Sequence, residues 1–115
     1  MTTRQIARLL SLLHSRIKRE TDIERHQHGA VIIDPSGNVV SVGVNVRGSG
    51  FSSRFSIHAE EMALIRAAHK GGIPRGSTIL VARLRSRGSW GSSRPCDRCR
   101  YLIDETLNIS EVRYT

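Results

Sequence analysis

The chain has 115 residues, 38 % of them apolar, and a net charge of +8 from 18 Lys and Arg against 10 Asp and Glu. This length suits one domain over residues 1–115 and excludes two, and the apolar content excludes a disordered chain. Because no apolar run approaches the roughly 20 residues of a membrane helix and no secretory signal is visible, we expect a cytoplasmic protein with no membrane partner.

The first half of the chain predicts a helix and a hairpin. Residues 3–20 place apolar side chains at helical spacing on one stripe, with most of the basic side chains away from it. Residues 29–33 and 39–46 are β-branched runs. The segment 34–38 between them has a Pro and a Gly that suit a tight turn. These runs predict a β-hairpin.

The second half predicts further helices and strands separated by loops rich in Gly, Ser and Arg. In chain order these are a loop at 47–56, a helix at 58–70, a strand at 78–84, a loop at 85–94, a helix at 96–107 and a strand at 110–115. The helix at 58–70 is apolar nearly all round, so we expect it to be buried and to end at Gly71-Gly72. The order α-β-β-α-β-α-β predicts an α/β domain whose mixed four-stranded sheet has helices on it.

Two motifs, H-x-E at 58–60 and P-C-x-x-C at 95–99, predict a zinc site. Zn²⁺ prefers tetrahedral nitrogen and sulfur ligands, and a catalytic zinc keeps its fourth position for water. Cys96 and Cys99 lie three apart at a helix start, so both thiols project to one side and the helix dipole favours thiolates. His58 opens the other helix and can reach the same point. We therefore expect one Zn²⁺ per chain, held by His58, Cys96 and Cys99.

Glu60 turns this metal site into a hypothesis about catalysis. Two residues beyond His58, its carboxylate lies near the metal but in a different radial direction. It can take a proton from zinc-bound water, whose pKa the metal lowers to roughly 7. It can then pass protons to a substrate ring nitrogen and to a leaving amine. Glu60 is therefore the predicted general acid and base of a hydrolytic deamination.

Together these residues match the H-x-E…P-C-x-x-C pattern of zinc deaminases, and the chain resembles the cytidine/deoxycytidylate deaminase superfamily. The likeness covers about residues 29–115, with matching core elements at 28–33, 43–45, 58–64 and 78–82. It is nearer to the deoxycytidylate and tRNA-adenosine branches, because free cytidine deaminases usually have Cys where His58 stands. The resemblance implies the three-layer, cytidine-deaminase-like sandwich fold.

The resemblance also implies substrate contacts. Asn45 looks like the asparagine that contacts sugar or base in related deaminases, and the backbone N–H of Ala59 is expected to bond the pyrimidine carbonyl. The remaining candidates border the site: Arg47, Phe51 and Arg54 in the loop at 47–56, then Arg94 and Pro95 before the first cysteine.

Several residues keep a second interpretation. A C-x-x-C pair also occurs in redox proteins, although that chemistry needs no upstream H-x-E. The spacing of His26 and His28 invites a metal role, but surface positions are commoner. Trp90 can stack on a base or pack onto the domain. The arginines in both loops favour an anionic partner, a nucleotide phosphate or a single-stranded nucleic acid, over a merely solubilising surface.

Three functions follow from these observations. The first is deamination of a free cytosine nucleotide or nucleoside, such as dCMP, to the uracil product with release of ammonia. The second is deamination of cytosine, or less readily adenine, in single-stranded DNA or RNA. The third, an inactive zinc-stabilised nucleic-acid-binding module, leaves Glu60 without a purpose. Most members of the superfamily continue past the fourth strand with a further helix and strand, whereas the last predicted strand here is the one at 110–115. Because an uncovered strand edge is a liability, we also expect that a second copy covers the edge of the sheet.

Overall fold

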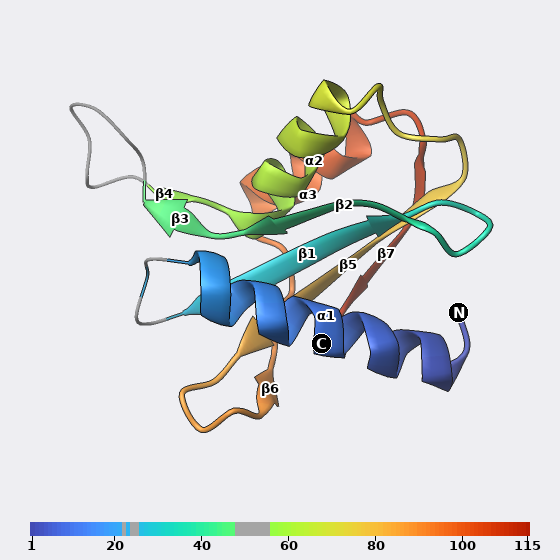
Figure 1. The fold of residues 1–115 in the computed structure, drawn as a ribbon. Coiled ribbons are helices and arrows are strands. Elements are labelled where there is room, and N and C mark those ends of the chain that lie inside the picture. Colours follow the sequence, from blue (N-terminus) through green and yellow to red (C-terminus); the bar gives the residue numbers. More distant parts are fainter. Residues whose placement is uncertain (22, 24–25, 48–55) are drawn as a thin grey trace.

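The fold is a sheet covered by helices on both faces, as Figure 1 shows for the computed structural model, which describes residues 1–21, 23, 26–47 and 56–115. Helix α1 covers one face, and α2 and α3 cover the other, so the predicted three layers are confirmed. The elements in chain order are α1 (Thr3–Glu20), β1 (Gln27–Ile33), β2 (Val39–Val44), β3 (Val46–Arg47), β4 (Ser56–Ile57), α2 (Ala59–His69), β5 (Ser77–Leu84), β6 (Trp90–Gly91), α3 (Asp97–Asp104) and β7 (Ile109–Tyr114).

The main sheet is mixed, as predicted, but it has five strands where the sequence predicts four. Strand order is β2-β1-β5-β6, and β7 also pairs with β5. Only the β5–β7 pairing is parallel, because α3 carries the chain across between them. The extra strand, β6, lies inside the predicted loop at 85–94. Its two residues pair with Arg83 and Leu84, a ladder too short to leave a periodic pattern.

A second, two-stranded sheet lies directly before α2. Val46 pairs with Ile57 and Arg47 with Ser56, so Val46 belongs to β3 and does not extend β2 as predicted. This pairing brings the end of the hairpin next to the segment that leads into His58. Residues 48–55 lie outside the part of the chain that the structure describes, and with them two predicted substrate contacts, Phe51 and Arg54.

Alternation along β1 divides the core into two halves. Ala30 and Ile32 face α2 and α3, whereas Val31 and Ile33 face α1. The α1 side is filled by Leu9, Leu13, Val42, Leu80 and Ala82, and the α2 side by Ala59, Ala63, Ala67, Ile79, Val81 and Ile103. Because successive side chains of a strand point to opposite faces, one β-branched strand serves both layers.

Helix α2 lies close to the sheet because alanines occupy the face that packs on it. Ala59, Ala63 and Ala67 are fully buried against it. The opposite face is in water, where Ile65 keeps 42 % of its surface exposed, so the expectation of a helix buried nearly all round is wrong. The predicted stop is confirmed: the N–H of Gly72 donates to the Ala67 carbonyl at 2.9 Å, and the φ of Gly72 is 104°.

Helix α3 is shorter than predicted. It ends at Asp104, three residues before the predicted limit, and Leu107 beyond it is 96 % exposed. Among the described helices, none combines the length and apolar character that crossing a bilayer requires.

Candidate active site

The predicted zinc ligands come together where α2 and α3 begin. His58 is the N-cap residue of α2, with an extended backbone, and Cys96 is the N-cap residue of α3. The Nδ1 atom of His58 lies 3.2 Å from the Sγ atom of Cys99 and 3.6 Å from that of Cys96. One ligand atom from each of these three residues lies within 4.8 Å of the other two. Two helix starts, distant in sequence, thus meet at one point.

These distances suit a tetrahedral zinc ion. Zn–S bonds of about 2.3 Å and Zn–N bonds of about 2.0 Å put nitrogen and sulfur ligands about 3.5 Å apart in a tetrahedron. The separations of 3.2 and 3.6 Å fall on either side of that value. Nitrogen and thiolate donors are also the set that zinc prefers. The group of His58, Cys96 and Cys99 therefore fits one zinc ion per chain, with Nδ1 as the histidine donor.

The environment of the two thiols differs. Cys99 is fully buried and Cys96 is exposed. Burial raises the pKa of the Cys99 thiol well above its ordinary value, and the nearby charges of Glu60 and Cys96 raise the pKa further. Binding of a divalent cation displaces the thiol proton and removes this penalty. The site is closed on the Cys99 side and open on the Cys96 side.

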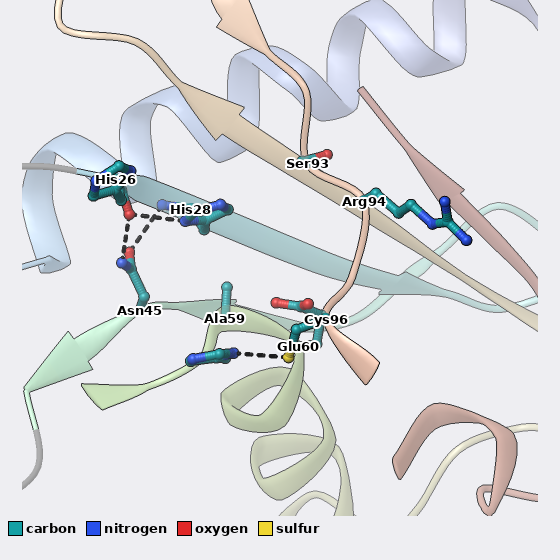
Figure 2. Close-up of a pocket in the computed structure, with 9 residues that line it drawn as sticks. His26, His28, Asn45, Ala59, Glu60, Ser93, Arg94 and Cys96 are labelled. Atoms are coloured by element: carbon teal, nitrogen blue, oxygen red, sulfur yellow. Dashed lines mark hydrogen bonds between the residues drawn. The ribbon is translucent and has the colours of Figure 1, made fainter. Parts of the chain in front are cut away.

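Glu60 lies in the first turn of α2 with only 5 % of its surface exposed. Glu60 lines the same pocket as His28 and Cys96, and its negative charge acts to raise the pKa of both the Cys99 thiol and the His28 ring. Figure 2 shows this carboxylate beside Cys96, directed into the pocket. A buried carboxylate beside an open ligand position is the arrangement that proton transfer requires.

A pocket of about 270 Å³ opens over these groups. It is lined by His26, His28, Asn45, His58, Ala59, Glu60, Ser93, Arg94 and Cys96. Glu60 and Cys96 lie on one side of the pocket, and His26, His28 and Asn45 lie across from them (Figure 2). The backbone N–H of Ala59 belongs to the first turn of α2, which the His58 side chain does not cap, so it is one of the helix's open donors.

The Asn45 side chain holds the histidine wall in place. Its Oδ1 accepts the N–H of His28 at 2.9 Å, and its Nδ2 donates to the His26 carbonyl at 2.7 Å (Figure 2). The Thr21 hydroxyl donates to the Asn45 carbonyl at 2.6 Å. These bonds retain His26 at a φ of 55°, a left-handed conformation that costs energy in a residue other than Gly.

His28 presents a defined nitrogen to the pocket. Its Nδ1 lies 2.8 Å from the His26 carbonyl oxygen, which can only accept, so Nδ1 carries a hydrogen and Nε2 is free of that bond. Burial lowers the pKa of His28, and the charges of Arg83 and His58 act in the same direction. The ring is therefore held neutral, with Nε2 as an acceptor near neutral pH.

Ser93 fixes the third wall. Its hydroxyl donates to the Val81 carbonyl at 2.7 Å and accepts the N–H of Thr115 at 2.9 Å. The N–H of Ser93 donates in turn to the Thr115 carbonyl. The segment that runs from β6 to Cys96 is thereby tied to β5 and to the last residue of the chain, so Arg94 approaches the pocket from a fixed backbone.

The predicted site residues are only partly brought together. Asn45, Ala59 and Arg94 line the pocket with the metal group and Glu60. Pro95 instead lines a neighbouring depression with Arg94, Asp97, Arg100 and Tyr114. Arg47 lies in β3 and is not among the described residues that line the pocket.

The sequence reasoning missed the pocket positions of His26, His28 and Ser93. One signal was present: His28 is in phase with Ala30 and Ile32, the residues of β1 that face α2. That phase places His28 on the metal side of the sheet. For Ser93, which is held by bonds to distant strands, we find no sequence signal.

Comparison with known proteins identifies the family. The family model for the cytidine and deoxycytidylate deaminase zinc-binding region matches residues 3–115, and the chain belongs to this family. A search of curated proteins finds no match.

Solved structures of deaminases share the fold. The dCMP deaminase of cyanophage S-TIM5, in complex with dCMP and dUMP, is 21 % identical with a TM-score of 0.72, covering 99 % of this chain and 82 % of its own. A cytidine deaminase from Burkholderia pseudomallei is 22 % identical with a TM-score of 0.70, and the match covers 100 % of this chain and 87 % of that protein. A cytidine deaminase from Mycobacterium tuberculosis is 22 % identical with a TM-score of 0.60, and the match covers 92 % of this chain and 83 % of that protein.

Proposed function

We propose that residues 1–115 form one zinc-dependent deaminase domain, which hydrolyses the amino group of a cytosine nucleotide or nucleoside to give the uracil product and ammonia. The observation that carries the proposal is the position of the buried Glu60 carboxylate, beside the His58, Cys96 and Cys99 group and open to the same pocket. Family membership supports the reaction class.

Each residue has a distinct role in this proposal. His58, Cys96 and Cys99 hold the metal, which when bound supplies the Lewis acidity that makes a nucleophile available from water at neutral pH. Glu60 takes a proton from the attacking water and donates it to the ring nitrogen next to the reacting carbon. It then takes the second proton from the hydroxyl added to that carbon and passes it to the amino group, which leaves as ammonia while the carbonyl forms. The N–H of Ala59 orients the base through its carbonyl oxygen.

The far wall of the pocket faces the sugar in this arrangement. Asn45 uses both ends of its side chain on the backbone of His26 and His28, so we propose that it contacts substrate mainly by holding this wall. Arg94, which lines the same pocket, is our candidate for contact with an anionic group of the substrate. The dCMP bound by the cyanophage relative supports a phosphorylated substrate.

The test is Glu60→Gln, with ammonia release and bound zinc both measured. We expect turnover to fall at least about 10²-fold, the size of a general acid–base contribution, while zinc content stays at one per chain. The matched control is Glu61→Gln, one residue along α2, which loses only an ion pair to Arg98. Such an exposed pair is worth at most about 1 kcal/mol.

Two outcomes would contradict the assignment. If the turnover of Glu60→Gln equals that of Glu61→Gln, the Glu60 carboxylate has no role in the reaction. If His58→Ala and Cys96→Ala retain the wild-type zinc content, these residues are not the zinc ligands. A substrate panel of cytosine, cytidine, CMP, dCMP and short single-stranded oligonucleotides then identifies the substrate class.

A further inference from the structure

A second cavity adjoins the pocket on the side away from the metal group. Its volume is about 650 Å³, and His26 lines both it and the pocket over the metal group. The other lining residues are Gln27, Arg83, Leu84, Arg85, Ser86, Arg87 and Ser89. His26 therefore lies at the boundary between this cavity and the pocket over the metal group.

The cavity is basic, and no acidic side chain among the described residues neutralises its charge. Arg83, Arg85 and Arg87 line it, and no Asp or Glu does. None of the three arginines forms a salt bridge with the residues that the structure describes. Other arginines of this chain are paired, as Arg66 is with Glu20. Three guanidinium groups around one cavity, with no salt bridge to the part of the chain that the structure describes, favour an anionic ligand.

Arg83 is built into this place by its neighbours. It lies opposite His28 in the sheet and opposite Gly91 in β6. The guanidinium covers Gly91 so closely that a Cβ there would lie 2.5 Å from an Nη atom. Its Nε is buried without a hydrogen-bond partner among the described residues. An unpaired buried N–H costs about 1–3 kcal/mol, and this arrangement fixes the remaining guanidinium nitrogens at the cavity.

The β5–β6 turn brings the other two arginines to the same cavity. The N–H of Arg85 donates to the Ser89 carbonyl at 2.8 Å, and that of Gly88 donates to the Arg85 carbonyl at 2.9 Å. The φ of Gly88 is 88°, which closes the turn. Arg85 and Arg87 are exposed on this hydrogen-bonded turn, next to the fixed Arg83. Guanidinium forks are the side chains best suited to hold phosphate oxygens.

We propose that this arginine cavity binds a phosphate group that lies beyond the sugar of the bound cytosine nucleotide. The inference rests on the proposed function, because it takes the base to lie beside Glu60. The phosphate has two possible sources, the 5′-phosphate chain of a free nucleotide or the neighbouring phosphodiester of a single strand. Both present the same oxygens to Arg83, Arg85 and Arg87.

The kinetic test compares four substrates: cytidine, CMP, CTP and a single-stranded trinucleotide with a central cytidine. The variants are Arg85→Gln/Arg87→Gln and, separately, Arg83→Gln. The control, Arg4→Gln/Arg75→Gln, removes two exposed charges outside both cavities. In the Arg85→Gln/Arg87→Gln variant we expect kcat/KM to fall at least ten-fold more for a phosphate-bearing substrate than for cytidine. The control should show no such difference.

The pattern of loss identifies the source. A loss for CMP or CTP alone assigns the cavity to the 5′-phosphate chain, and a loss for the trinucleotide alone assigns it to a single strand. An equal fall for cytidine and every phosphorylated substrate overturns the proposal. Because Arg83 is packed on Gly91, the kinetics of Arg83→Gln are interpreted together with its thermal unfolding curve. The Arg85→Gln/Arg87→Gln variant, which changes only exposed side chains, decides whether the cavity binds phosphate.

A binding measurement separates this proposal from the proposed function. Fluorescence anisotropy of a labelled trinucleotide, or calorimetry with CTP, is repeated at several salt concentrations. For a single strand, each lost phosphate contact reduces the slope of log K against log salt by about 0.7. A slope and affinity equal to wild type in Arg85→Gln/Arg87→Gln, for both ligands, contradicts the phosphate site. Absence of wild-type turnover on all four substrates would instead contradict the deaminase activity.

Discussion

Replacing Gly43 with alanine is expected to push α2 away from the sheet and with it both His58 and Glu60. Gly43 lies in β2 under the first turns of α2, and an added Cβ would lie 2.4 Å from the carbonyl oxygen of Ala59 and from the nitrogen of Ala63. Both are backbone atoms of a helix, so neither can rotate away. Since such contacts are not seen below 3.0 Å, the helix must move by at least about 0.6 Å.

The size of the effect follows from that displacement. Overpacking of a rigid core costs up to about 3 kcal/mol, which in a chain of this length lowers the melting temperature by about 12 °C. A displacement near 1 Å of a catalytic group costs about 10²-fold in rate, so a shift of about 0.6 Å predicts a loss of at least about ten-fold. Thermal unfolding and ammonia release measure the two effects.

Gly29→Ala is the matched control. Its added Cβ also meets close neighbours, at 3.1 Å, but these are the methyl ends of Ile17 and Leu13 on the α1 side, which can rotate. We expect a loss of about 1 kcal/mol and turnover within a few-fold of wild type. Equal melting temperatures and equal turnover for the two variants would refute the reasoning that Gly43 sets the height of α2 above the sheet.

Three further predictions concern the metal, His28 and Glu20. Chelation should lower the melting temperature of the wild type by about 10 °C, which is the effect of losing an ion present at about 100 times its Kd. The melting temperature of Cys96→Ser should not change on chelation, and an equal decrease in both proteins would contradict the metal site. The lowered pKa of His28 makes its contribution to stability complete above its ordinary value of 6.5 and lost as the pH falls below it. The free energy of unfolding should therefore fall more steeply between about pH 7 and pH 5 than in His28→Gln, and identical slopes would contradict it. Glu20 forms ion pairs with Arg16 and Arg66. Glu20→Gln should therefore lower the free energy of unfolding, measured in denaturant titrations, by about 0.5–1 kcal/mol, and by less in about 1 M salt. A decrease that does not depend on salt would exclude an ionic cause.

The metal group could be predicted because local geometry decides it. Cys96 and Cys99 are three residues apart at a helix start, and that spacing alone orients both thiols. His58 lies at the start of the other helix, where the H-x-E motif places it. The sequence could not place Pro95, since its position depends on the path from β6 to α3, which the bonds of Ser93 determine.

The far wall could be predicted only in part. Asn45 is a predicted contact and the phase of β1 indicates His28, but the bonds that hold His26 and His28 against Asn45 depend on the register of β1 with β2. Register is a long-range property, and no local pattern records it. Likewise β6 is a strand only because Arg83 and Leu84 offer an edge to pair with. A short strand in a segment rich in Gly and Ser therefore cannot be predicted from that segment alone, because its pairing depends on the rest of the sheet.

Because His58 caps α2 and Cys96 caps α3, the three donors come from two segments that meet only in the finished domain. The complete set of donors therefore exists only in the folded chain, so a metal ion that binds all three of them stabilises the folded state over the unfolded one.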